Sequence, residues 1–251
     1  MRRCGAVCGA VVAMLVGGLT ACSSGPAGSS ITVFAAASLE PVFTEIATRF
    51  EVDHPGVTVA FNFAGSADLA TQLVQGARAD VFASANTTQM DNVAQADLLD
   101  GAAVPFATNT LVIVTAPGNP HAVGSLADLA APGLSVVVCQ VPVPCGAATR
   151  TVAGVAGVAL HPVSEEPSVT DVLNKVITGQ ADAGVVYRTE AQHAGDKVTA
   201  VEFPEAARAV NTYPIAVLRE TSHAGQARAF VDLVTGETGR TFLRAAGFGR
   251  P

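Results

Sequence analysis

Residues 31–52 constrain the fold most, because their hydrophobic pattern changes period at Ser38. Residues 31–37 form a nearly unbroken apolar run, which is typical of a strand buried on both faces of a parallel sheet. Beyond Ser38, apolar residues recur at the spacing of an amphipathic helix: Leu39, Val42, Phe43, Ile46 and Phe50. The pattern therefore predicts a strand that turns directly into a helix, with Ser38 as the N-cap.

A strand followed at once by a helix is a common anion-binding arrangement in α/β proteins. The first backbone N–H groups of a helix have no partner within the helix, and the helix dipole is positive at that end. In the turn at Ser38 these groups and the serine hydroxyl should point at one spot. The same order recurs at the strand 57–63 and Ser66. A lone serine in such a turn is more often only a cap, whereas two matched turns favour an anion site.

The first residues have the pattern of an export signal. Arg2 and Arg3 precede a short apolar region that ends in Leu-Thr-Ala-Cys at 19–22, which resembles a bacterial lipobox. We expect residues 1–21 to be a lipoprotein signal peptide and residues 22–30 a tether. Cys22 would carry the lipid that anchors the exported protein to the outer face of the cell membrane. The alternative is an ordinary signal peptide with an incidental cysteine.

The charge of the chain excludes some partners. The formal net charge is −7, and loss of Arg2 and Arg3 with the signal would leave the mature chain more acidic. Nucleic acid requires a basic face, so we do not expect it as a partner. Any anion site must therefore attract its ligand through local groups, against the negative electrostatic potential of the protein as a whole.

The order of the predicted elements indicates an α/β protein with two lobes. Residues 110–115 form a strong strand that begins the second lobe, and residues 211–215 have the pattern of a return crossing. We place lobe 1 at 31–107 plus 215–251 and lobe 2 at 108–214. Two crossings between two α/β domains imply a hinge and a ligand cleft.

Five segments carry a resemblance that covers nearly all of the mature chain. They are ITVFAAASL at 31–39, FAGSADLA at 63–70, GARADVFAS at 76–84, VPCG at 143–146 and GQADAGVVYRTEA at 179–191. The chain resembles the periplasmic molybdate-binding proteins of ABC importers. The resemblance implies the periplasmic-binding-protein fold, a molybdate or tungstate ligand, and transporter permease and ATPase subunits as partners. We expect a monomer without a cofactor or enzymatic activity.

The resemblance also implies which groups hold the oxyanion. Lobe 1 would supply the hydroxyls of Ser38 and Ser66, and lobe 2 the N–H groups of Cys145 and Val169 and the hydroxyl of Tyr187. No residue would ligate the metal atom directly. Such donors suit a fully deprotonated oxyanion better than hydrogen phosphate, whose proton needs an acceptor. Sulfate is also a pure acceptor, so it must be rejected by size.

The chain departs from the family pattern at Ala67, where many members have serine, and at Cys145, where many have alanine. The second change leaves the amide intact. Cys139 and Cys145 are the cysteines that neither leave with the signal nor occupy the lipobox. Outside the cytoplasm they are plausible disulfide partners, and a metal pair is the weaker alternative because no histidine lies at ligand spacing.

Other functions have weaker support. A receptor of the same fold for another oxyanion, such as sulfate, is the nearest alternative. A serine hydrolase would pair Ser38 or Ser66 with a histidine, but the chain has no Gly-x-Ser-x-Gly elbow. A receptor for iron or an organic ligand would need paired tyrosines or aromatic walls, and the only tyrosines are Tyr187 and Tyr213.

Overall fold

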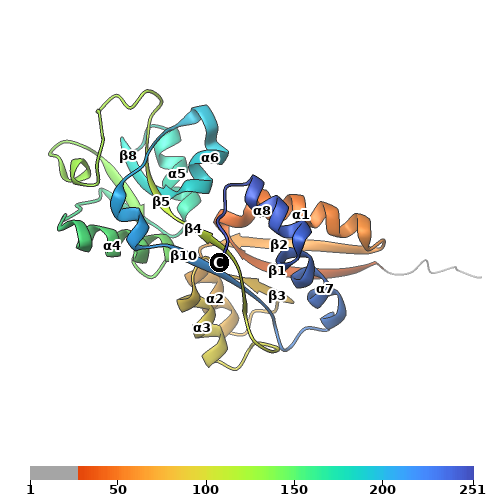
Figure 1. The fold of residues 1–251 in the computed structure, drawn as a ribbon. Coiled ribbons are helices and arrows are strands. Elements are labelled where there is room, and N and C mark those ends of the chain that lie inside the picture. Colours follow the sequence, from red (N-terminus) through yellow and green to blue (C-terminus); the bar gives the residue numbers. More distant parts are fainter. Residues whose placement is uncertain (1–27) are drawn as a thin grey trace, which may run out of the picture.

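The computed structural model describes residues 28–251, which form two lobes joined by two side-by-side chain crossings (Figure 1). Each lobe is built on a five-stranded sheet, with the strand orders β2-β1-β3-β10-β4 and β7-β6-β8-β5-β9. The predicted signal peptide, Cys22 and most of the predicted tether lie outside the described residues. Among residues 28–251, no helix is long and apolar enough to cross a membrane.

Lobe 1 contains both ends of the described chain. Its strands are β1 (Ser29–Ala36), β2 (Val57–Ala64), β3 (Val81–Ala83), β4 (Val104–Asn109) and β10 (Asn211–Val217). Its helices are α1 (Glu40–Asp53), α2 (Ser66–Val74), α3 (Thr87–Gln95), α7 (Ala224–Thr235) and α8 (Glu237–Ala245). Strand β1 is parallel to β2 and β3, whereas β10 is antiparallel to β3 and β4.

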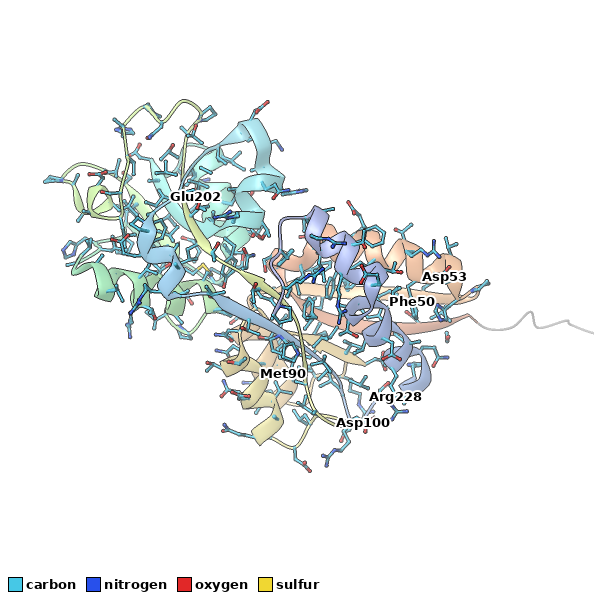
Figure 2. All side chains as sticks on the ribbon, viewed as in Figure 1. Phe50, Asp53, Met90, Asp100, Glu202 and Arg228 are labelled. Carbon is cyan, nitrogen blue, oxygen red and sulfur yellow. A yellow bond between two sulfur atoms is a disulfide. The ribbon has the colours of Figure 1, made fainter. Side chains whose placement is uncertain are left out.

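Helices cover both faces of the lobe 1 sheet, which explains the unbroken apolar run of β1. Val33 packs in the cluster that contains Phe50 of α1, whereas the next residue, Phe34, packs in the cluster that contains Met90 of α3. Figure 2 labels Phe50 and Met90 on these separate helices. Successive residues of a strand point to opposite faces, so both faces of β1 had to be apolar.

Lobe 2 repeats the layered plan. Its strands are β5 (Leu111–Thr115), β6 (Val136–Cys139), β7 (Ser164–Glu166), β8 (Ala183–Tyr187) and β9 (Thr199–Val201). Its α-helices are α4 (Pro144–Ala156), α5 (Val169–Ile177) and α6 (Arg188–Ala194). Short 3-10 helices are η1 (Ala37–Leu39), η2 (Ala127–Ala130), η3 (Gly195–Lys197) and η4 (Pro204–Arg208), of which η1 belongs to lobe 1.

The crossings lie a few residues from their predicted positions. Asn211 pairs with Asn109 at the start of an antiparallel ladder, so β10 belongs wholly to the lobe 1 sheet. The predicted boundaries 107/108 and 214/215 therefore fall inside β4 and β10. Residues 211–215, predicted as the return crossing, are part of β10, whose ladder shifts register between Tyr213 and Pro214. Such irregularities are where a strand tolerates the missing N–H of proline.

Candidate anion-binding cleft

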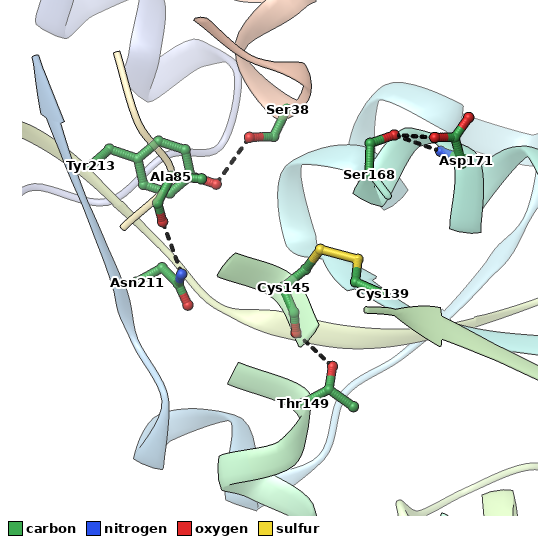
Figure 3. The surroundings of a disulfide bond; sticks show 9 residues. All are labelled: Ser38, Ala85, Cys139, Cys145, Thr149, Ser168, Asp171, Asn211 and Tyr213. Atoms are coloured by element: carbon green, nitrogen blue, oxygen red, sulfur yellow. Dashed lines mark hydrogen bonds between the residues drawn. A yellow bond between two sulfur atoms is a disulfide. The ribbon is translucent and has the colours of Figure 1, made fainter. Parts of the chain in front are cut away.

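The carboxyl ends of strands from both lobes face one another across the cleft. Ser38 follows β1 and Ser66 follows β2, while Cys145 begins α4 after β6 and Tyr187 ends β8. Together with Val169, at the start of α5, these residues line one small cavity with a volume of about 10 Å³. The structure thus brings all of the predicted ligand residues to one place (Figure 3 shows part of it).

The lobe 1 hydroxyls are buried and already have partners. The Ser38 hydroxyl lies 3.0 Å from the Tyr213 hydroxyl, and Ser66 Oγ accepts a 3.0 Å hydrogen bond from the N–H of Ala85. Neither serine caps a helix, so the prediction of Ser38 as an N-cap is wrong. The helical turn begins one residue earlier, at Ala37, which places Ser38 inside the first turn and frees its hydroxyl for the cavity.

The amides offered by lobe 2 lie in the first turns of two helices. Cys145 is in the first turn of α4, and Val169 is the first residue of α5. First-turn N–H groups have no partner inside their helix and carry the positive end of its dipole. Ser168 caps α5 by accepting a hydrogen bond from the N–H of Asp171, at 3.2 Å (Figure 3). This cap fixes the helix end that presents the Val169 amide.

A disulfide joins the end of β6 to the start of α4 (Figure 3). The sulfur atoms of Cys139 and Cys145 are 1.96 Å apart, and their Cα atoms are 5.7 Å apart. The connecting loop is tight, because a Cβ added at Gly146 would lie 1.9 Å from the carbonyl oxygen of Gln140. The bond and the close approach together restrain the Cys145 amide.

Tyr187 is the most unusual group in the cavity. Its side chain is 1% exposed, and its hydroxyl has no hydrogen-bond partner among the described residues. Leaving a buried polar group unpaired costs about 1–3 kcal/mol, so such groups are rare and point to a missing acceptor. Burial, with a smaller contribution from Tyr213, raises the pKa of Tyr187 well above its usual value. The hydroxyl is therefore a neutral donor at physiological pH.

The two lobes touch beside the cavity. A Cβ added at Gly65 in lobe 1 would lie 2.1 Å from the carbonyl oxygen of Pro167 in lobe 2. Gln89 Nε2 of α3 donates a 2.8 Å hydrogen bond to the carbonyl of Pro142, across the same cleft. The arrangement is therefore a closed one, in which donors from both lobes surround a single small volume.

The cavity lining contains no charged side chain. Within residues 28–251, no group of three or more His, Cys, Asp or Glu side chains is placed to hold a metal ion. Neither Ser38 nor Ser66 hydrogen-bonds to a histidine in the described structure, so the pairing that a serine hydrolase requires is not formed there. The chemistry on offer is hydrogen-bond donation by neutral groups and helix dipoles, which suits an anion.

Sequence reasoning missed the polar residues behind the cavity. Asn109, Thr189, Glu190 and Tyr213 are buried where the lobes join, and hydrogen bonds connect them to Ser38. Burial raises the pKa of Glu190 to about 7, although the hydrogen bond from Thr189 opposes the shift. These residues come from β4, β10 and α6, and no local pattern in the sequence marks them as neighbours.

Two α/β lobes joined by two crossings, with a buried donor site between them, define an extracellular solute receptor of the periplasmic-binding-protein class. The family model of the bacterial extracellular solute-binding proteins matches residues 31–249, and the chain belongs to this family. It is 58% identical to the molybdate-binding protein ModA of Mycobacterium tuberculosis H37Rv, with 100% of both chains covered. It is 31% identical to ModA of Escherichia coli K12, covering 87% of this chain and 88% of that protein. These relatives confirm the resemblance that the sequence segments indicate.

Solved structures confirm the fold. The periplasmic molybdate-binding protein of Azotobacter vinelandii superposes with a TM-score of 0.76 at 22% identity, covering 88% of this chain and 99% of that one. The sulfate-binding protein SubI of Mycobacterium tuberculosis gives a TM-score of 0.72 at 23% identity, covering 88% and 86%. At these identities the likeness concerns the architecture alone, which is the predicted two-lobed α/β fold.

Proposed function

We propose that this protein is an extracytoplasmic receptor that captures molybdate, and also tungstate, and delivers it to the permease and ATPase subunits of an ABC importer. The observation that carries the proposal is a small cavity lined by neutral donors from both lobes, including the unpartnered hydroxyl of Tyr187. The 58% identity to a molybdate-binding protein over the whole chain supports the choice of ligand. The protein holds its ligand without transforming it.

The donor set favours a fully deprotonated oxyanion. Ser38, Ser66 and Tyr187 offer hydroxyls, and Cys145 and Val169 offer amides. A dianion that presents only acceptors can satisfy all of these donors, whereas hydrogen phosphate brings a proton that finds no carboxylate in the lining. Neutral donors also hold the anion without a salt bridge, which allows release when the lobes open.

The size of the cavity argues against larger ligands. Pockets for organic ligands usually measure roughly 300–1,000 Å³. The cavity volume here is only about 10 Å³, and Tyr187 is the one aromatic residue among the described residues that line it. A single tetrahedral oxyanion is the class of ligand that fits. Sulfate belongs to the same class, so its rejection rests on its smaller size.

Isothermal calorimetry with molybdate, tungstate, sulfate and phosphate tests the ligand. We expect molybdate and tungstate to bind much more tightly than sulfate, and phosphate to bind most weakly. At 100 times the dissociation constant, a ligand adds about 2.7 kcal/mol to the stability of the folded state. Molybdate should therefore raise the melting temperature by about 5–10 °C. Tighter binding of sulfate than of molybdate would replace the proposal by the sulfate alternative.

The proposal includes attachment to the membrane through a lipid on Cys22. Its support is the Leu-Thr-Ala-Cys sequence at 19–22. Intact-mass measurement of the protein from the membrane fraction should give a chain that begins at Cys22 and carries acyl groups. An unmodified Cys22 in that fraction would contradict the anchor and leave the ligand proposal unaffected.

A further inference from the structure

A chain of buried hydrogen bonds leads from the cavity to the crossing between the lobes. The Ser38 hydroxyl lies 3.0 Å from the Tyr213 hydroxyl (Figure 3), which lies 3.4 Å from Asn109 Nδ2. Asn109 Nδ2 also donates to Thr189 Oγ1 at 2.8 Å, and Thr189 Oγ1 donates to Glu190 Oε2 at 3.1 Å. All of these side chains are buried. These hydrogen bonds join η1, β10 and β4 of lobe 1 to α6 of lobe 2.

The amide of Asn109 determines which groups donate and which accept in this series of hydrogen bonds. The N–H of Thr110 donates to the side-chain Oδ1 of Asn109 at 3.0 Å, which identifies the oxygen of the amide. The nitrogen must therefore face Thr189 and Tyr213. An amide nitrogen is only a donor, so the oxygen of the Tyr213 hydroxyl acts as acceptor toward Asn109.

The same reasoning makes the Tyr213 hydroxyl the donor to Ser38. Its hydroxyl proton needs an acceptor, because an unpaired buried donor is costly. The Ser38 oxygen, 3.0 Å away, is the acceptor that the described residues provide. Once Ser38 accepts from Tyr213, its own proton is left to point into the cavity that Ser38 lines.

We propose that Asn109 and Tyr213 are positioning residues that hold Ser38 as a hydrogen-bond donor toward the ligand, and thereby set the preference for fully deprotonated oxyanions. This inference rests on the proposed function and concerns the selectivity of the same site. A serine that is free to rotate can also accept the proton of hydrogen phosphate. A serine held as a donor instead points its own proton at the proton of hydrogen phosphate, and the repulsion between them disfavours this ligand.

The Tyr213 hydroxyl can be removed with little change in packing. The ring contacts Phe106, Phe248 and Tyr187 edge to face, with centroids 6.3, 5.4 and 6.0 Å away. Phenylalanine at position 213 keeps these contacts and deletes only the group that orients Ser38. The Tyr213→Phe variant therefore separates the orienting role of the hydroxyl from the structural role of the ring.

The test compares wild type, Tyr213→Phe, Asn109→Ala and the double variant in the full chain. Calorimetry measures sodium molybdate directly, and competition against molybdate measures sodium phosphate, both at neutral pH. We expect Tyr213→Phe to lower the ratio of molybdate to phosphate affinity by about tenfold, and Asn109→Ala to lower it by less. Because Asn109 acts through Tyr213, its substitution should change the ratio no further in the Tyr213→Phe background.

Thr115→Val is the matched control, since Thr115 has a fully buried hydroxyl that bonds to the carbonyl of Ala116 at the end of β5 away from Tyr187. It should leave the ratio unchanged, and melting without ligand verifies that every variant is folded. An unchanged ratio in Tyr213→Phe, or additive effects in the double variant, would overturn the inference while wild type still binds molybdate. Wild type that fails to bind molybdate would instead overturn the proposed function, and this inference with it.

Discussion

The two faces of the cleft offer hydrogen-bond donors in different states. On the lobe 1 face, Ser38 bonds to Tyr213 and Ser66 accepts from the amide of Ala85, so both hydroxyls are oriented by their own lobe. On the lobe 2 face, the hydroxyl of Tyr187 has no partner in the described structure. Under the proposed function, lobe 1 is thus a prepared half-site, whereas lobe 2 contributes a donor that the ligand would satisfy.

This difference gives the ligand a direct influence on the closing of the lobes. A ligand shifts a conformational equilibrium only by its differential affinity for the two states. Under the proposed function, an oxyanion held by Ser38 and Ser66 would gain the Tyr187 hydroxyl and the amides of Cys145 and Val169 only when lobe 2 closes over it. The lobe 2 donors would then supply the free energy that favours the closed state.

Blocking the contact between the faces should have the largest effect. Gly65 has φ −59°, which alanine adopts readily, but its added Cβ would lie 2.1 Å from the carbonyl oxygen of Pro167. Gly65→Ala should weaken molybdate binding by about 100-fold, because the lobes could close only with overpacking of about 1–3 kcal/mol and would otherwise lose the lobe 2 donors. Calorimetry measures the affinity.

Gly154→Ala is the control for the Gly65 variant. Gly154 lies inside α4, and a Cβ there meets nothing within 4 Å. This substitution should leave binding unchanged and raise stability by about 0.5–1 kcal/mol, as expected for alanine in a helix. Molybdate affinity close to wild type in Gly65→Ala would show that molybdate binds without the close contact between Gly65 and Pro167.

Removing the unpartnered donor sharpens the comparison further. A hydrogen bond to a charged acceptor contributes roughly 1.5–3 kcal/mol, so Tyr187→Phe should raise the dissociation constant for molybdate by about 10- to 150-fold. The same substitution deletes a buried hydroxyl without a partner, so the ligand-free protein should melt at the same or a higher temperature. Molybdate binding as tight as in wild type would mean that Tyr187 is structural.

Ser38→Ala provides the counterpart on lobe 1. It should weaken binding by a similar factor, but it also leaves the Tyr213 hydroxyl without the Ser38 oxygen as acceptor, and should therefore lower ligand-free stability by about 1 kcal/mol. Without ligand, Ser38→Ala should consequently melt at a lower temperature than wild type, whereas Tyr187→Phe should not. Equal melting shifts would remove the distinction between the two faces.

Local sequence patterns predicted those parts of the molecule that depend on local physics. The change of period at Ser38 located β1 and the helix after it, because burial on both faces of a sheet and on one face of a helix leaves different spacings. The pattern did not give the true helix start at Ala37, since a shift of one residue leaves the apolar spacing almost unchanged. The role of Ser38 as an N-cap was wrong for that reason.

Long-range pairing was beyond the reach of such patterns. The ladder between β4 and β10 joins residues far apart in the chain, and it places Asn109 beside Tyr213. The pattern of residues 211–215 was interpreted as a return crossing, so the lobe boundary was misplaced there. The local pattern indicated Ser38 and Ser66, whereas the lobe 2 residues of the cavity came from the family resemblance, which carries long-range information that a single pattern of hydrophobic residues does not contain.

A smaller effect concerns Glu190, which lies behind the cavity. Burial raises its pKa from 4.5 to about 7, so the folded protein holds a proton that the unfolded chain releases. Stability from this group is complete below pH 4.5 and is lost as pH rises through about 7, with a total change of about 3 kcal/mol. Molybdate binding should weaken by up to about tenfold over the same rise, because ionised Glu190 repels a dianion.

Glu190→Gln should remove both pH dependences while keeping a similar volume. Denaturant unfolding and calorimetry from pH 5.5 to pH 8 measure them, at micromolar molybdate. The groove beside Glu190 also contains Glu40, Glu45, His193 and Lys197, so a His193→Gln variant serves as the control for the neighbouring side chains. Identical pH profiles for wild type and Glu190→Gln would exclude the buried carboxyl as the cause.

The smallest effect on binding should come from the disulfide, because it acts on the position of a single lobe 2 amide, that of Cys145. Ser38 is held by Tyr213, whereas the Cys145 amide is restrained by the bond to Cys139 and by the tight turn at Gly146. Replacing both cysteines with alanine should lower the free energy of unfolding by about 2 kcal/mol, as expected for closure of a short loop. Molybdate binding should weaken by less than tenfold, since the amide remains but its position is less defined. Alkylation that labels both Cys139 and Cys145 in the folded, unreduced protein would contradict the bond. Complete loss of molybdate binding on reduction would mean that the donors of lobe 2 depend more on the disulfide than those of lobe 1 depend on Tyr213.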